Sequence, residues 1–233
     1  MGDRMWRRPA MTQRARLLGA LVVAAAAVSS AWSAESTCEK VSQIVTQIRR
    51  ADYEGDRAAL KRLHAELAPC AEDEKLDSRV SYWRGFALWR RSINGFNDSA
   101  DPIELEADLA QAAIEFDAAS AADPEFVDAI AGAASCLGYE MYLNSNDPER
   151  LQELAADLGP RINKAREAAP GHPRLVWVMG PMVWNSPPER GGGQDKAIES
   201  YEKALETLRE QKGGESDPLE PSWGEAELLM SLA

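Results

Sequence analysis

A spaced pattern of small and large residues recurs three times in the second half of the chain and constrains its fold most. In each copy a small or medium residue, a large residue and an alanine follow one another at steps of four and three, and in two copies a proline follows five residues later. The copies are Ala112-Phe116-Ala119-Pro124, Leu158-Ile162-Ala165-Pro170 and Ala197-Tyr201-Ala204. Steps of four and three lie along one face of a helix, which the proline then ends. Units of this kind bury their apolar faces by stacking on their neighbours.

Turn and cap residues divide the whole chain into helices. Ala, Leu, Glu and Arg are frequent, and no stretch alternates apolar and polar residues as a strand does. Asp101-Pro102 and Asp147-Pro148 each supply a cap and a first-turn proline, and Ser222 offers a cap before the last helix. Pro160 either kinks its helix or divides it in two. The sequence predicts an all-α chain with helices at 36–51, 55–69, 76–95, 101–122, 125–144, 148–169, 173–184, 193–212 and 222–232.

The recurring face resembles the second helix of the tetratricopeptide repeat (TPR) family, and the resemblance covers residues 76–233. It implies antiparallel helical hairpins stacked as a right-handed solenoid, with a last capping helix and with first helices that line a concave groove. Gly85, Ala134 and Gly180 would be the small residues at the close helix contacts. The spacing between copies exceeds the regular repeat of about 34 residues, so the chain resembles a divergent, exported bacterial member.

The N-terminus has the form of an export signal. Arg14 and Arg16 precede a short apolar run, Leu17 to Val28, and small residues follow it. We expect cleavage and a periplasmic or secreted protein, although an uncleaved anchor and a true start at Met11 are alternatives. The expected parts are a signal peptide at 1–34, an N-terminal helical hairpin at 35–75 and the TPR-like repeats at 76–233.

An exported chain permits disulfides. Cys38 lies near the start of the first expected helix and Cys70 just past the end of the second, ends that are neighbours in an antiparallel hairpin. The sequence therefore predicts a Cys38–Cys70 disulfide, with two unrelated thiols as the alternative. Cys136 lies in an apolar helical run and is expected to be a buried small hydrophobe.

Charge and motif content exclude several classes of function. Without residues 1–34 the chain has 21 Lys and Arg against 37 Asp and Glu, a net charge of −16, and such a surface repels nucleic acid. The two histidines are far apart, and neither a metal-binding spacing nor a nucleophile motif is present. We therefore expect no enzyme activity, no metal and no cofactor.

Aromatic and cationic residues on the expected first helices are the candidates for binding. Tyr82-Trp83-Arg84 and Trp89-Arg90-Arg91 form a cationic-aromatic patch that could hold a carboxylate ligand or a peptide C-terminus. The alternative is that the tryptophans belong to the core and that the arginines pair with acidic residues of the next helix. The candidate ligand- or partner-binding residues are Trp83, Arg84, Trp89, Arg90, Tyr142, Trp177, Trp184 and Arg190.

Three glycines, Gly191 to Gly193, precede the helix expected at 193–212. Exposed backbone N–H groups at a helix start attract anions, with Arg190 as a helper. The alternative is a tight turn in which glycine serves the backbone geometry.

These features favour an exported scaffold that binds a protein or peptide partner in the concave groove. The alternative is a small-molecule-binding accessory component of a periplasmic, TRAP-type solute transport system. A closed apolar pocket would favour the small molecule, and an open groove would favour the peptide.

Overall fold

A computed structural model describes residues 39–211 and 217–233. Val41 to Ala233 form one compact unit. The expected signal peptide and Cys38 lie outside the described residues and stay predictions. The helices are a first one over residues 39–54, then α2 (Arg57–Leu67), α3 (Asp77–Asn97), α4 (Pro102–Ala122), α5 (Val127–Leu143), α6 (Pro148–Ala168), α7 (Pro173–Asn185), α8 (Gln194–Gln211) and α9 (Glu225–Leu232), with short 3-10 turns at Ala68–Glu72 and Pro188–Arg190.

The prediction of an all-α fold is confirmed for the described part of the chain, in which no strand occurs. Capping explains where two helices begin: Asp101 accepts from the Ile103 amide, and Asp147 accepts from the amides of two residues in the first turn of α6. Pro160 lies inside an unbroken α6 and does not divide it. Ser222 does not cap the last helix, which starts three residues later than expected, after Gly224.

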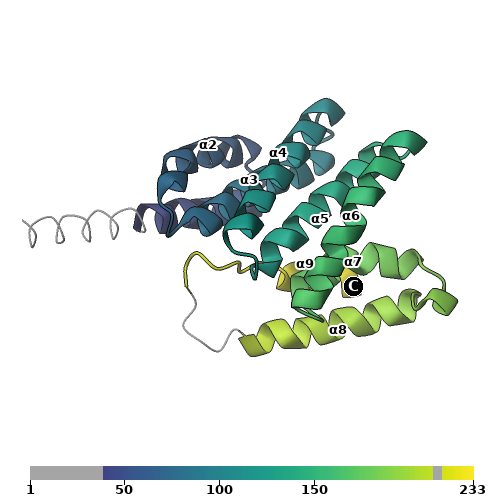
Figure 1. The fold of residues 1–233 in the computed structure, drawn as a ribbon. Helices are drawn as coiled ribbons and strands as arrows, with labels where there is room; N and C mark the ends of the chain where they lie inside the picture. The colour runs from purple at the N-terminus through teal and green to yellow at the C-terminus, as the bar shows by residue number, and fades with distance from the viewer. Residues whose placement is uncertain (1–38, 212–216) are drawn as a thin grey trace, which may run out of the picture. The chain divides into compact units, whose positions relative to one another are not determined.

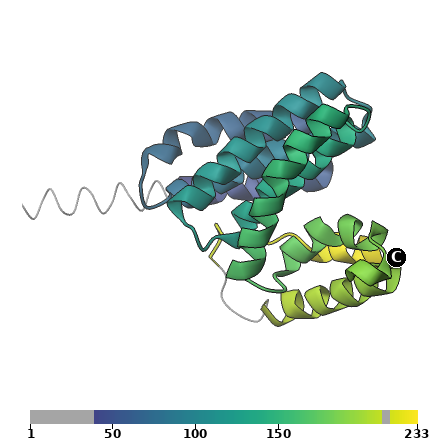
Figure 2. The same ribbon diagram turned by 45° about the vertical axis from the view of Figure 1, so that its right-hand side comes forward.

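Helices that follow one another in sequence pack against one another (Figure 1). The contacts run from α2 to α3, α3 to α4, α4 to α5 and α5 to α6, and then from α7 to α8 and α8 to α9, with a further contact between α5 and α7. Figure 2 shows α9 beside α7 and α8. Antiparallel neighbours with short connections explain this order.

Small residues of first helices face large residues of second helices. A Cβ on Gly85 would lie 3.0 Å from the Phe116 ring, and a Cβ on Gly180 would lie 1.7 Å from the Tyr201 hydroxyl. Ala134 and Ile162 share one buried cluster. The predicted role of Gly85 and Gly180 in close helix contacts is therefore confirmed, and the large residue of each recurring pattern is buried.

Aromatic rings of α3 form the centre of the core. Trp83 and Trp89 are 0% exposed, and Phe86 lies between them with ring centroids 5.0 and 5.6 Å away. Phe116 from α4 lies 5.4 Å from the Tyr82 ring. Packed aromatic rings stabilise a fold by more than their buried area alone accounts for. The rings of α3 are therefore a main source of stability for the core.

Among the residues described, none of the helices combines the length and the apolar character needed to cross a bilayer.

Candidate functional site

The C-terminal segment, residues 217–224, crosses helices that lie far from it in the sequence. It contains a turn at Pro218-Leu219 and no helix, so the carbonyl groups of Pro218 to Trp223 are not used in a helical ladder. It contacts the helix over residues 39–54 as well as α3 and α7. These correspond to the helices expected at 36–51, 76–95 and 173–184, each of which is expected to open a hairpin with the helix that follows it. We call the residues that hold it the segment-binding surface: Arg49, Arg79, Tyr82, Trp83 and Arg174.

One end of the C-terminal segment is held through its backbone carbonyls. Arg49 Nη2 donates to the carbonyls of Pro218 and Glu220, both at 2.8 Å. The Trp83 indole Nε1 donates to the carbonyl of Leu219 at 2.7 Å. Three consecutive carbonyls thus accept hydrogen bonds from two side chains, and hydrogen bonds from a charged donor are the stronger kind.

Arg174 of α7 holds the other end. Its Nη2 donates to the carbonyl of Pro221 at 2.7 Å, and its Nε donates to the carbonyl of Trp223 at 2.8 Å. Its Nη1 lies 3.2 Å from both carboxylate oxygens of Asp128 on α5. Because Arg174 is 7% exposed, the Asp128 carboxylate provides the counter-charge that burial of its guanidinium requires.

Three side chains of the segment enter the surface. Leu219 is 2% exposed. Glu220 lies 2.7 Å from Arg79 Nη2. The Trp223 indole donates to the Tyr82 hydroxyl at 2.8 Å, and its ring centroid lies 5.1 Å from that of Trp89 and 5.7 Å from that of Trp177. An apolar, an acidic and an aromatic side chain therefore each have a defined place.

Each of the three arginines also lies over an aromatic ring. The guanidinium carbon of Arg49 is 4.8 Å from the Trp83 ring centroid, and that of Arg79 is 3.8 Å from the ring of Phe126. The third, Arg174, is 5.6 Å from the ring of Trp223 itself. Stacking fixes the plane of a guanidinium, so its donors point in set directions. Arg49 is therefore oriented toward the carbonyls by a ring of the core, whereas the ring over Arg174 belongs to the C-terminal segment itself.

A cavity of about 430 Å³ adjoins the C-terminal segment. Burial lowers the pKa of His172, one of its residues, which lies 3.6 Å from Asp128 through Nε2. The Nδ1 atom of His172 is buried and has no hydrogen-bond partner among the described residues. The lining of the cavity combines three carboxylates with one buried arginine, one histidine and one tryptophan. The lining residues are Asp128, His172, Arg174, Leu208, Gln211, Glu220, Pro221, Ser222, Trp223 and Glu225.

The structure places the predicted tryptophans of α3 in the core. Trp83 and Trp89 are fully buried, so neither is open to an external ligand in this state. This corrects the expectation that they line an accessible surface, since the rings fill the space between packed helices. Trp83 nevertheless touches the C-terminal segment, while the Trp89 indole donates to Ser135 at 3.1 Å.

The arginines beside these tryptophans are held in ion pairs. Arg84 donates to both carboxylate oxygens of Glu115. Arg90 lies 2.6 Å from Asp52 and 3.2 Å from Glu227. They are therefore not available to a ligand. Arg84 pairs with the next helix, as the alternative expected, whereas the partners of Arg90 lie on the helix over residues 39–54 and on α9. Arg91 pairs with Glu104 and Asp108 of the next helix, as that alternative expected.

The other predicted residues lie in different places and do not form one site. Tyr142 is 69% exposed and lies against Phe96, with ring centroids 5.8 Å apart. Trp177 is half-buried against Trp223. Trp184, at the end of α7, is 37% exposed. Arg190 lies exposed in a 3-10 turn.

The three glycines after Arg190 form a tight turn. Gly191 and Gly193 have φ of +78° and +107°, which favours glycine. The amides of Gly192 and Gly193 donate to the carbonyls of Pro187 and Val183. These donors are used inside the turn, which supports the alternative of a tight turn over an anion site.

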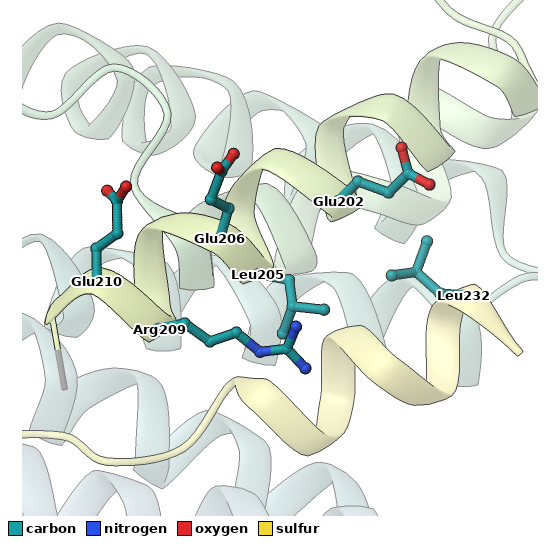
Figure 3. A pocket seen from close by; sticks show the side chains of 6 residues that line it. All are labelled: Glu202, Leu205, Glu206, Arg209, Glu210 and Leu232. Carbon is teal, nitrogen blue, oxygen red and sulfur yellow. The ribbon is translucent and has the colours of Figure 1, made fainter.

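A second hollow, open and of about 720 Å³, lies between α8 and α9. Leu205 and Arg209 of α8 point toward α9, and Leu232 points back from it (Figure 3). Glu202, Glu206 and Glu210 point away from α9. Because its apolar floor consists of two leucines inside an acidic rim, we assign it no ligand.

Sequence reasoning missed most of the segment-binding surface. Arg49, Arg79 and Arg174 belong to no recognisable sequence motif. The run from Asp217 to Trp223, with two prolines, a leucine and a tryptophan, was the available signal of a non-helical segment with side chains to bury.

Among the described residues Cys70 and Cys136 form no disulfide, and both are buried, at 4% and 0% exposed. The partner predicted for Cys70 lies outside the described residues, so the disulfide stays a prediction. Burial raises the pKa of the Cys136 thiol, which fits an unreactive core residue.

No model of a known protein family matches the sequence, and no curated protein matches it either. Among solved structures the chain is similar to the HusA haemophore from Porphyromonas gingivalis, with 20% sequence identity and a TM-score of 0.65. The match covers 83% of this chain and 90% of the haemophore chain. At this identity the similarity shows a shared helical fold.

Proposed function

We propose that this chain is an exported, divergent TPR-like scaffold whose first helices bind a segment of a protein or peptide partner. In this proposal the hairpins stack as a right-handed solenoid, and the segment-binding surface belongs to its concave side. The pairing of Gly85 with Phe116 and of Gly180 with Tyr201 supports the repeat register.

One observation carries the proposal: the segment-binding surface already holds a polypeptide segment. Arg49, Trp83 and Arg174 bind the carbonyls of residues 218, 219, 220, 221 and 223, and every polypeptide offers such carbonyls. Main-chain hydrogen bonds give affinity for a peptide, and side-chain slots give specificity. A row of N–H donors directed at successive carbonyls fits a polypeptide backbone better than a neutral small molecule.

Site-specific photocrosslinking tests this function. A benzophenone amino acid replaces Gln211, which is exposed at the end of α8 and lines the cavity beside the C-terminal segment, and for the control it replaces Gln152, which is exposed on α6. Each purified protein is irradiated with a cell-envelope extract of the source organism. We expect one protein crosslinked at position 211 and not at 152. Equal products at both positions, or none at position 211, would contradict the proposal.

A second candidate function is small-molecule binding, the alternative that the sequence left open. It is supported by the cavity of about 430 Å³ beside His172 and by the fold shared with a haemophore. The carboxylates of Asp128, Glu220 and Glu225 in the lining disfavour an anionic ligand such as haem. Titration of the protein with haemin, followed by absorbance, decides the point: saturable binding that His172→Ala abolishes would favour this candidate over the scaffold.

A further inference from the structure

The C-terminal segment occupies the surface that the proposed function assigns to a partner. Its contacts spread over three helices that are far apart in sequence: Arg49 precedes Pro218 by 169 residues, and Arg174 precedes Trp223 by 49. A partner segment could not bind the same arginines at the same time, because their N–H groups already donate to the C-terminal segment. The surface is therefore filled in the structure by the chain itself.

The segment uses the kinds of contact that a separate peptide would use. The donors Arg49 and Arg174 recognise carbonyls without regard to sequence. Three side chains add selectivity: Leu219 in a buried slot, Glu220 opposite Arg79, and Trp223 against Tyr82 and the aromatic rings. None of these contacts is covalent, and none requires that the segment belong to the same chain.

We propose that residues 217–224 are a built-in competitor that mimics the partner, so that partner binding displaces them. This inference rests on the proposed function and names the chemistry of the partner. The partner presents a non-helical, proline-containing segment with an apolar residue, an acidic residue after it and a tryptophan three residues further on. An acidic side chain suits this surface because Arg79 supplies its counter-charge.

A fluorescent peptide with the sequence of residues 217–229 is the probe. Its binding to the purified full chain and to Trp223→Ala is measured by fluorescence anisotropy. Trp223→Ala weakens the internal competitor and leaves the segment-binding surface intact. We expect this variant to bind the probe at least about tenfold tighter than the unchanged protein, since losing several aromatic contacts is worth that much. Adding Arg49→Gln should abolish the gain.

A second variant covers the case in which Trp223→Ala does not fold, as judged by circular dichroism. Glu220→Gln removes only the ion pair with Arg79, and the Glu220 side chain is 42% exposed. It should also tighten binding of the probe, by a smaller factor. Glu210→Gln, on the exposed face of α8, is the matched control and should change nothing.

Equal probe affinity in the unchanged protein and in the folded variants would overturn the inference. This failure differs from failure of the proposed function. If position 211 still crosslinks one envelope protein while the variants bind the probe no better, the proposed scaffold function is kept and the internal competitor is rejected.

Discussion

The indole Nε1 of Trp83 donates a 2.7 Å hydrogen bond to the carbonyl of Leu219, 136 residues further along the chain. Trp83 lies near the start of α3, and Leu219 lies in the non-helical C-terminal segment. Trp83 is 0% exposed and Leu219 is 2% exposed, so the bond forms away from water. A buried donor without its acceptor costs more than the bond itself contributes. The hydrogen bond therefore couples the segment to the centre of the core.

Phe116→Ala should destabilise the protein by about 3–5 kcal/mol, as removal of a buried phenylalanine does. The side chain is 1% exposed and contacts α3 through Gly85 and Tyr82. The free energy of unfolding from urea denaturation measures the loss. A loss below about 1 kcal/mol would mean that the register of α3 against α4 differs from the structure.

Gly132→Ala should destabilise the protein by about 1–3 kcal/mol, because overpacking forces rings out of their places. The added Cβ would lie 2.6 Å from the Phe116 ring. Gly138, on the same helix, has no atom within 4 Å of such a Cβ and is the matched control. Gly138→Ala should stabilise by about 0.5–1 kcal/mol through helix propensity. Equal effects of the two changes on the thermal midpoint would contradict this packing.

Arg90→Glu should destabilise the protein by about 3–5 kcal/mol, since it breaks a largely buried ion-pair network. The new carboxylate would face Asp52 and Glu227, which now share the Arg90 guanidinium at 2.6 and 3.2 Å. Arg50→Glu is the control, because it makes the same change of charge at an exposed arginine. It should hardly change the thermal midpoint. An unchanged midpoint in Arg90→Glu would show that the network is not stabilising.

Glu115→Gln should remove stability that depends on pH. Burial alone would raise the pKa of this carboxyl, but hydrogen bonds from His64 and Arg84 outweigh it and lower the pKa to about 2 from 4.5. A lowered pKa contributes stability that is present above about pH 4.5 and is lost as the pH falls toward 2.

At pH 7 the loss for Glu115→Gln should be about 2–3 kcal/mol. Urea denaturation at pH 7, 5, 4 and 3 measures it, and the gap to the unchanged protein should narrow below pH 4.5. Glu153→Gln, a 69% exposed side chain on α6, is the control. A gap that stays constant from pH 7 to pH 3 would refute the assignment.

The helices and their packing register could be predicted because their signals are local. Asp147-Pro148 starts α6 where expected, and the step from Ala112 to Phe116 to Ala119 defines the buried face of α4. Such signals need only neighbouring residues, so one sequence contains them in full.

The candidate site could not be predicted in the same way, because its contacts are not local. Nothing near Arg49 in the sequence indicates the carbonyls of residues 218 and 220, and nothing near Trp223 indicates Tyr82. The prediction of an accessible cationic-aromatic patch on α3 was wrong for a related reason. Burial of Trp83 and Trp89 and the pairing of Arg90 with Asp52 depend on other helices.

Hydrogen exchange of the Trp83 indole, measured by NMR on the full chain, tests the central claim most directly. If the C-terminal segment lies on the segment-binding surface in solution, the Trp83 Nε1 hydrogen should exchange far more slowly than that of Trp184, whose side chain is 37% exposed. Trp223→Ala should speed the exchange at Trp83 and leave Trp184 unchanged. Equal rates for Trp83 and Trp184 in the unchanged protein would contradict the claim that the segment is bound there.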